Sequence, residues 1–251
     1  MTVLEVPPLV VGTTKPAGLT ALAALPRGDR LPELIEARLD LALPAGGPAS
    51  ALPDLSAFLP DCRRLEETGS PVLITVRLVD DGGRWTEDAS RAPLFEAALS
   101  EGACSWVDIE VESTIAAQIV RSAHRKGRRA IVSHHAFAGT PSIEALMTIV
   151  DRARALDADI VKVATQVTSL EDHDRLLELL RARRGDALAV IGMGAFGTPL
   201  RTYLACVGSR LTYGFLDEVA APGQLPVREL VARLIGDCPA YAEARQKRGT
   251  P

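Results

Sequence analysis

Cysteine is scarce in this sequence, and no two cysteines lie close together. Cys62, Cys104, Cys206 and Cys238 are spread singly over 251 residues, without the close pairs that a zinc site needs. Isolated thiols are typical of proteins kept in a reducing compartment, so we expect a cytoplasmic protein. No other segment has metal-ligand spacing, and the sequence therefore predicts a site that works without a metal or another cofactor.

Long apolar runs are also missing. No stretch is long and apolar enough to span a bilayer, and the opening residues MTVLEVPPLVVGTT lack the basic region and apolar run of a secretory signal. Neither sign of charge is in large excess, because 32 acidic and 28 basic side chains leave a net charge of −4. This balance argues against nucleic acid and anionic membranes as partners.

What the sequence does contain is a repeated unit of an amphipathic stretch, a glycine and a short apolar run. Gly69, Gly102, Gly127 and Gly185 each stand between such a stretch and such a run. Glycine can adopt the left-handed conformation that ends a helix, so we expect all four to close helices. The unit is typical of helices that alternate with buried parallel strands.

Eight candidate strands fill the chain. They comprise residues 9–12, 34–40, 72–77, 106–110, 130–134, 159–164, 187–193 and 211–215. Eight strands with interleaved helices predict an α/β fold, a single-domain (β/α)8 TIM barrel over residues 1–251. In such barrels the chemistry lies at the carboxyl ends of the strands.

Those strand ends carry charged and titratable residues, which are costly inside a core and instead fit one polar mouth. The residues are Glu36, Arg38, Arg77, Asp108, Glu110, His134, His135 and Lys162. The sequence therefore predicts one active site at one end of the barrel.

Lys162 lies within DIVKVA, a run that otherwise has the composition of a buried strand. Lysine is almost never fully buried without a partner or a function. One interpretation is that its ammonium reaches water or pairs with a carboxylate at the strand end. The other is that desolvation and the cations Arg38, Arg77 and His135 keep its amine neutral, so that it can attack a ketone.

His134 and His135 end the run AIVSHH. Because successive strand side chains point to opposite sides, only one of the two can point into the barrel. A histidine in that position is either a structural hydrogen-bonding group or a general acid and base beside Lys162. The residues alone leave both interpretations open.

A glycine motif offers a competing hypothesis. Gly192, Gly194 and Gly197 form G-x-G-x-x-G after the apolar run ALAVI, and Asp217 follows at a spacing that suits a ribose ligand. The motif falls on the seventh strand–helix unit, whereas a dinucleotide-binding fingerprint normally opens its domain. A tight turn that brings backbone close to a substrate anion explains the glycines as well. No G-x-S-x-G elbow offers a serine nucleophile.

Taken together, the strand-end motifs resemble those of the type I 3-dehydroquinate dehydratases, in order and at fitting spacing from the second strand to the last loop. The matching segments are E-x-R-x-D (Glu36, Arg38, Asp40), T-x-R with a Gly pair (Thr75, Arg77, Gly82, Gly83), VDIE (Asp108), S-x-H-x-F-x-x-T-P (Ser133, His135, Phe137, Thr140, Pro141), DIVKVA (Lys162), M-x-x-x-G with a following Arg (Met193, Gly197, Arg201), TYG (Tyr213) and APGQ (Gln224).

The resemblance implies a metal-free hydro-lyase of the shikimate pathway, a homodimer that acts on a small molecule. Lys162 would form an imine with the C3 ketone of 3-dehydroquinate and acidify the adjacent C2 proton. His135 would take that proton and then protonate the departing C1 hydroxyl, a syn elimination that gives 3-dehydroshikimate. Asp81 is the implied catalytic carboxylate. The implied substrate-binding residues are Arg201 at the carboxylate, Glu36, Arg38, Arg77 and Gln224 at the ring hydroxyls, and Phe137, Met193 and Tyr213 as apolar walls.

The sequence departs from the family pattern at four positions. Asp81 stands where the family usually has Glu, Ala136 where it has Asp, and Leu200 and Ala220 where it has Ser. We hypothesise slower turnover of 3-dehydroquinate or the same imine chemistry on a related cyclic keto acid. A class I aldolase, a catalytically retired barrel that acts as a binding module and a dinucleotide-dependent enzyme are the remaining alternatives.

Overall fold

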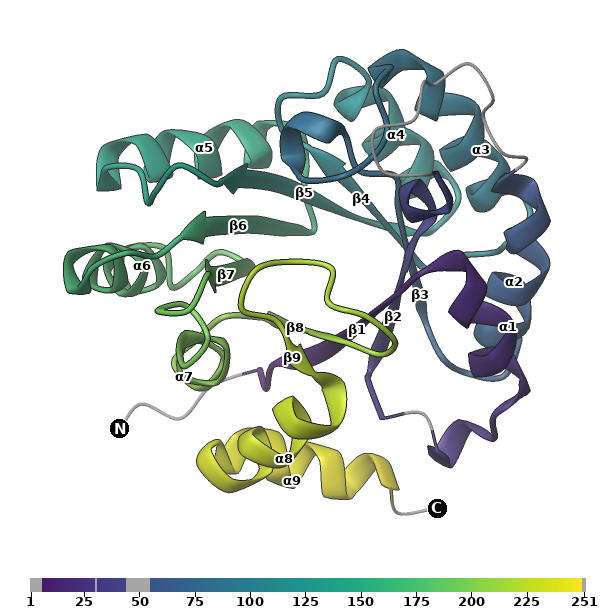
Figure 1. Ribbon diagram of the computed structural model, residues 1–251. Coiled ribbons are helices and arrows are strands. Elements are labelled where there is room, and N and C mark those ends of the chain that lie inside the picture. The colour runs from purple at the N-terminus through teal and green to yellow at the C-terminus, as the bar shows by residue number, and fades with distance from the viewer. Residues whose placement is uncertain (1–5, 30, 44–54, 250–251) are drawn as a thin grey trace.

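The computed structural model describes residues 6–29, 31–43 and 55–249, and a parallel sheet curled into a barrel occupies its centre (Figure 1). Its strands are β1 (Leu9–Thr14), β2 (Leu34–Arg38), β3 (Val72–Thr75), β4 (Trp106–Glu110), β5 (Arg129–Ala136), β6 (Ile160–Gln166), β7 (Leu188–Met193), β8 (Leu211–Phe215) and β9 (Leu225–Pro226). Around the strands lie α1 (Pro16–Ala24), α2 (Leu59–Glu67), α3 (Ala92–Ser100), α4 (Ala116–Arg125), α5 (Ile143–Ala155), α6 (Leu170–Ala182), α7 (Leu200–Cys206), α8 (Val227–Asp237) and α9 (Pro239–Gly249).

Hydrogen-bonded strands follow one another in the order β7-β6-β5-β4-β3-β2-β1-β8-β9, and all pairs are parallel. Ser209, two residues before β8, joins the free edge of β7 to β8. The Val190 amide donates to Ser209 Oγ at 2.8 Å, and the Arg210 amide donates to the Leu188 carbonyl at 2.7 Å. These contacts complete the (β/α)8 barrel, and the predicted fold class is confirmed.

All eight predicted strands are present, with some differences at their ends. The predicted spans 106–110 and 211–215 match β4 and β8 residue for residue. The second predicted strand was too long, because after Arg38 the chain forms a 3-10 turn at Leu39–Ala42. The short β9, beside β8, was not predicted.

Alternation along the strands gives the barrel interior two levels. Near the start of the strands the interior side chains are apolar, and they include Leu34, Leu73, Trp106, Ile131 and Ile160. Two residues further on, the same strands carry the buried polar side chains Glu36, Thr75, Asp108, Ser133 and Lys162. Because side chains alternate with a period of two, each polar residue lies directly above an apolar one. The apolar level therefore forms a floor under the polar level.

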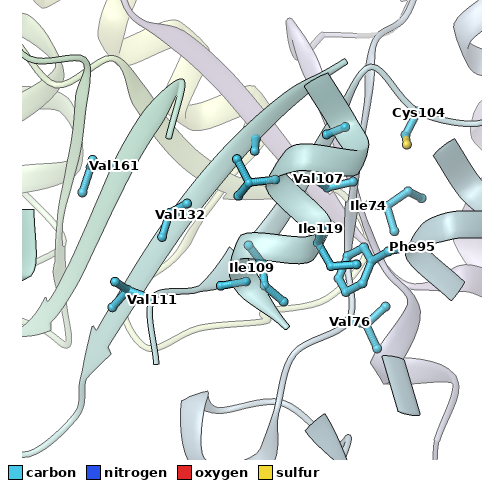
Figure 2. Close-up of a cluster of buried hydrophobic side chains, with 14 of the residues drawn as sticks. Ile74, Val76, Phe95, Cys104, Val107, Ile109, Val111, Ile119, Val132 and Val161 are labelled. Carbon is cyan, nitrogen blue, oxygen red and sulfur yellow. The ribbon is translucent and has the colours of Figure 1, made fainter. Parts of the chain in front are cut away.

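A second apolar layer separates the strands from the helices (Figure 2). Ile74, Val107 and Ile109 point outward from β3 and β4 and pack with Phe95 of α3 and Ile119 of α4. Burial of each such side chain contributes about 1.5–3 kcal/mol to the free energy of unfolding. This layer fixes the positions of the strands, and hence of the residues at their ends. None of the described helices is long and apolar enough to cross a membrane.

Three of the four predicted glycine helix ends have the expected conformation. Gly69, Gly102 and Gly127 have φ values of +80°, +68° and +66°. The prediction was wrong for Gly185, which is not among the residues with positive φ. Helix α6 ends at Ala182, three residues before Gly185. A turn then leads into β7, and in it the Asp186 amide donates a hydrogen bond to the Arg183 carbonyl.

Candidate active site

The eleven site residues predicted from the sequence all line one cavity of about 210 Å³. They are Glu36, Arg38, Arg77, Asp81, His135, Phe137, Lys162, Met193, Arg201, Tyr213 and Gln224. Thr13, Gly82, Ala164, Ile191 and residues 220–222 complete the lining. The cavity lies toward the carboxyl ends of the strands. The polar strand residues in its lining face the barrel interior and follow the apolar level along each strand.

Lys162 projects from β6 into the cavity and is 5% exposed. Its Nζ donates a hydrogen bond to Asp108 Oδ2 at 3.0 Å and lies 4.5 Å from the centre of the Tyr213 ring. The pairing with a carboxylate that one interpretation of the sequence predicts is therefore present. The same amine also lines the cavity, as the other interpretation requires.

A buried chain of alternating charges extends from Lys162 to the start of α3. Arg77 lies 2.8 Å from Asp108 and 2.9 Å from Glu110, and Arg91 lies 2.6 Å from the second oxygen of Glu110. Removal of one partner from such a buried pair typically costs about 3–5 kcal/mol. This series of ion pairs therefore holds Asp108 in a fixed place beside Lys162.

The charge state of Asp108 follows from this chain. Burial by itself would raise the pKa of its carboxyl, but the cations Arg77 and Lys162 and a hydrogen bond from Ser133 hold that pKa well below its usual range. The Ser133 hydroxyl donates to Asp108 Oδ1 at 2.6 Å. Asp108 is thus an anion at neutral pH, and it can stabilise positive charge at Lys162.

The alternation along β5 separates the two histidines. His135 lines the cavity, whereas the Nδ1 of His134 lies outside that lining, 3.0 Å from Glu112 Oε1. The His135 ring lies nearly parallel to that of Phe137, at 14° with 6.3 Å between centroids. Its Nδ1 is 3.4 Å from Asp81 Oδ1, without the geometry of a hydrogen bond.

Both groups of this pair have shifted pKa values. Burial first, and then the cations Arg77 and Lys162, lower the pKa of His135 well below its ordinary value. Burial first, and then repulsion by Glu110, raise the pKa of Asp81 to about 6. His135 is therefore neutral at neutral pH and can accept a proton, and Asp81 titrates on the acid side of neutrality.

Arg201, on α7, is held by backbone carbonyls. Its guanidinium donates to the carbonyls of Gly223, Pro222 and Tyr213 at 2.8, 3.0 and 3.2 Å. Burial lowers the pKa of Arg201 to about 10, with no carboxylate among the described residues to offset it. A buried cation held only by neutral groups is suited to bind a carboxylate.

Glu36 receives a hydrogen bond at each oxygen. Thr13 Oγ1 donates to Oε2 at 2.8 Å, and Thr75 Oγ1 donates to Oε1 at 3.0 Å. Gln224 approaches from the last loop, and its Nε2 donates to Thr13 Oγ1 at 3.1 Å. The neighbouring Arg38 forms a two-pronged pair with Asp40, with both distances 2.8 Å.

Sequence reasoning missed two residues that these contacts bring into the site. Thr13 lines the cavity, and Arg91 supports Glu110 from outside it. A threonine in β1 gives no motif, although its position two residues after the interior Val11 marks it as facing the cavity. Arg91 ends the 3-10 turn Asp88–Arg91 before α3, and nothing local connects it to Glu110.

The G-x-G-x-x-G segment forms a tight turn. A Cβ on Gly197 would lie 2.4 Å from the Gly192 carbonyl carbon, so backbone packs directly on backbone here. Asp217, the candidate ribose ligand, accepts hydrogen bonds from the Thr14 hydroxyl and the Lys15 amide at 3.0 Å each. The tight turn that the second interpretation predicts is therefore present, and the approach of its backbone to a substrate anion stays a prediction.

Known proteins show which family this arrangement comes from. The sequence model of the family described as "Type I 3-dehydroquinase" matches residues 10–235. A 3-dehydroquinate dehydratase of Methanosarcina barkeri is 36% identical over 207 residues, which cover 79% of this chain and 82% of that protein. The chain belongs to the type I 3-dehydroquinase family.

Other relatives and solved structures agree with this membership. A 3-dehydroquinate dehydratase of Thermodesulfovibrio yellowstonii is 34% identical over 161 residues, or 64% of this chain and 70% of that protein. The crystal structure of a 3-dehydroquinate dehydratase from Geobacillus kaustophilus matches 90% of each chain with a TM-score of 0.78 and 28% identity. The type I 3-dehydroquinase family thus accounts for the barrel as well as the motifs.

Proposed function

We propose that this protein dehydrates 3-dehydroquinate to 3-dehydroshikimate through an imine on Lys162. The observation that carries the proposal is the position of the Lys162 amine, buried in the cavity beside Asp108, with His135 in the same lining. Ser133 pairs with Lys162 in the β5–β6 register, so His135, two residues later, projects to the same side just above it. Membership in the type I 3-dehydroquinase family supports the same reaction.

The lysine supplies the nucleophile. Its amine adds to the C3 carbonyl of the substrate, and loss of the carbonyl oxygen as water leaves a C=N bond to Nζ. The protonated imine carries positive charge, which the anionic Asp108 at 3.0 Å stabilises. That charge withdraws electrons from the neighbouring carbon and acidifies its proton.

His135 then moves the proton. Its lowered pKa keeps the ring neutral, so it can take the C2 proton, and the resulting imidazolium can protonate the C1 hydroxyl as it leaves. One group serves both steps on one side of the ring, which makes the elimination syn. Hydrolysis of the imine releases 3-dehydroshikimate and restores the amine.

The remaining lining residues bind the ring. Arg201, without an anionic partner in the described chain, takes the substrate carboxylate. Phe137, Met193 and Tyr213 cover the apolar parts of the ring. The substrate hydroxyls are bound by the polar side chains Glu36, Arg38, Arg77 and Gln224.

The test is the absorbance of the conjugated enone product after the protein is mixed with 3-dehydroquinate. Wild type should produce it, and Lys162→Ala should lose the activity by at least about 10⁴-fold, because the nucleophile is gone. Lys126→Ala is the matched control, since the Lys126 amine donates to the Ser100 hydroxyl at the surface and does not line the cavity. An active Lys162→Ala variant would contradict the proposal.

In this proposal the departures from the family pattern lower the rate of 3-dehydroquinate turnover. Ala220 lines the cavity, so Ala220→Ser would place a hydroxyl at the wall that receives the substrate. We expect this variant to raise kcat/KM on 3-dehydroquinate by about 3- to 10-fold, the effect of one added hydrogen bond. A value at or below that of wild type would show that the alanine does not limit turnover.

We further propose that residues 1–251 act as one cytoplasmic domain that assembles as a homodimer. The continuous sheet and its closure at Ser209 support the single domain. Sedimentation equilibrium gives the assembly directly, as a mass near twice that of the 26.7 kDa chain.

A further inference from the structure

Thr13 connects two parts of the site that approach it from opposite ends of the chain. It lies at the second-last position of β1, where it is 2% exposed. Its hydroxyl donates to Glu36 Oε2 at 2.8 Å and accepts from Gln224 Nε2 at 3.1 Å. Since a hydroxyl has one proton and the carboxylate can only accept, the direction of both bonds is fixed.

Gln224 carries this connection into the loop 217–224. Its side-chain oxygen accepts from the Ala220 amide at 2.9 Å, so the amide group spans from the loop backbone to β1. The loop also rests on the turn after β7, where the Gly194 amide donates to the Pro222 carbonyl at 3.2 Å. Gln224 thus links the loop to β1, just as Arg201 links it to α7.

Glu36 receives the other end of the connection. Thr13 and Thr75 hold its two carboxylate oxygens from β1 and β3, the strands on either side of β2. With both oxygens held, the plane of the carboxylate is set, and the remaining lone pairs can accept from a ligand in the cavity. Loss of one donor would free the carboxylate to rotate about the other.

We propose that Thr13 is a positioning residue whose hydroxyl couples the docking of the loop 217–224 to the orientation of the Glu36 carboxylate. When the loop is docked, the Gln224 amide orients the Thr13 hydroxyl so that its proton points at Glu36. When the loop leaves, that orientation is lost and the carboxylate is held by Thr75 alone. The inference rests on the proposed function only for its effect on substrate binding.

The first test uses the protein without substrate. Thr13→Val keeps the shape of the side chain and removes the hydroxyl. Amide hydrogen exchange at Ala220 and Gly194 should then become about 3- to 10-fold faster, because the loop loses one hydrogen bond to the barrel. Thr13→Ser should restore both rates, and the Trp85 amide, bonded to the Arg77 carbonyl in another loop, should not change in either variant.

Thr75→Val is the matched control. It removes the other donor to Glu36 and leaves the contact with Gln224 in place. We expect exchange at Ala220 to stay at the wild-type rate in this variant. The double variant Thr13→Val/Gln224→Met should exchange no faster than the faster single variant, because both substitutions break the same link.

The second test measures steady-state kinetics with 3-dehydroquinate. Thr13→Val should raise KM by about 10-fold and change kcat by less than about 3-fold, and Thr13→Ser should stay near wild type. Two results of the exchange measurement would overturn the coupling. One is an unchanged exchange rate at Ala220 in Thr13→Val, and the other is an exchange rate at Ala220 in Thr13→Ser as high as that in Thr13→Val. A wild type without turnover would overturn the proposed function and the kinetic part, and exchange would still decide the coupling.

Discussion

At the scale of single residues, the surroundings of a side chain decide its chemistry. Asp108 lies on β4 and Asp81 in the 3-10 turn after β3, yet the pKa values of these two carboxylates shift in opposite directions. Arg77 and Lys162 hold the pKa of the first well below its usual range, whereas burial and Glu110 raise that of the second to about 6. Asp108 is thus an anion beside the Lys162 amine at neutral pH, and Asp81 titrates close to neutrality.

Asp81 should therefore produce the acid limb of the pH profile. Its carboxylate lies beside His135 and is protonated as the pH falls through about 6, so kcat/KM should decline there. Asp81→Asn should lower the plateau by about 10-fold and remove the limb near pH 6. A limb at the same pH in the variant would assign it to another group.

The raised pKa of Asp81 also predicts that removal of its charge stabilises the fold. A carboxyl with a raised pKa contributes stability in its protonated form, and this contribution is lost as the pH rises from about 4 to about 6. At pH 7 the ionised Asp81 is therefore unfavourable in the fold. Asp81→Asn should raise the free energy of unfolding at pH 7 by about 1 kcal/mol after solvent screening, or the Tm by about 2–4 °C. Thermal unfolding at pH 7 and pH 4 measures this, and the gain should vanish at pH 4.

The charged site residues on the strands could be predicted from the sequence because charge is conspicuous in an apolar run. Lys162 in DIVKVA shows this most clearly. Arg201, on α7, and Gln224, in the last loop, were predicted from the family resemblance alone. Thr13 could not be found in this way, because threonine is ordinary in a strand and its importance depends on partners more than twenty residues away. Arg91 escaped because its partner Glu110 lies 19 residues further along the chain.

At the scale of elements, a glycine that follows a helix is conformationally required only where its φ is positive. Gly127 follows α4 with φ +66° and would have no neighbour within 4 Å of an added Cβ, so its constraint is purely conformational. Gly185 also has open space around it but lacks the positive φ. The sequence pattern is the same at both positions, and only the structure separates them.

Alanine substitutions should reveal this difference. Gly127→Ala should lower the free energy of unfolding by about 1–2 kcal/mol, because an L side chain is strained in the left-handed region. Gly185→Ala should leave it unchanged or raise it by up to about 1 kcal/mol, because the unfolded chain loses freedom. Urea unfolding of the two variants measures both, and equal losses would contradict the assigned conformations.

At the scale of the whole molecule, the barrel was predictable because apolar runs that alternate with amphipathic stretches recur along the whole chain. The residues at which individual strands end were harder to predict. Residues 39 and 40 continue the second run in composition, yet they leave the sheet because Asp40 folds back to pair with Arg38. The unpredicted β9 depends on the last loop returning to β8, a contact that no local pattern encodes.

The most direct test of the account is borohydride reduction of the protein in the presence of 3-dehydroquinate, followed by peptide mass measurement. Reduction makes an imine permanent, so we expect one added substrate-derived mass per chain, on the peptide that contains Lys162. Lys15, Lys126 and Lys247 are the other lysines of the chain and serve as internal controls. Label on one of these lysines, or none on any, would contradict an imine mechanism at Lys162.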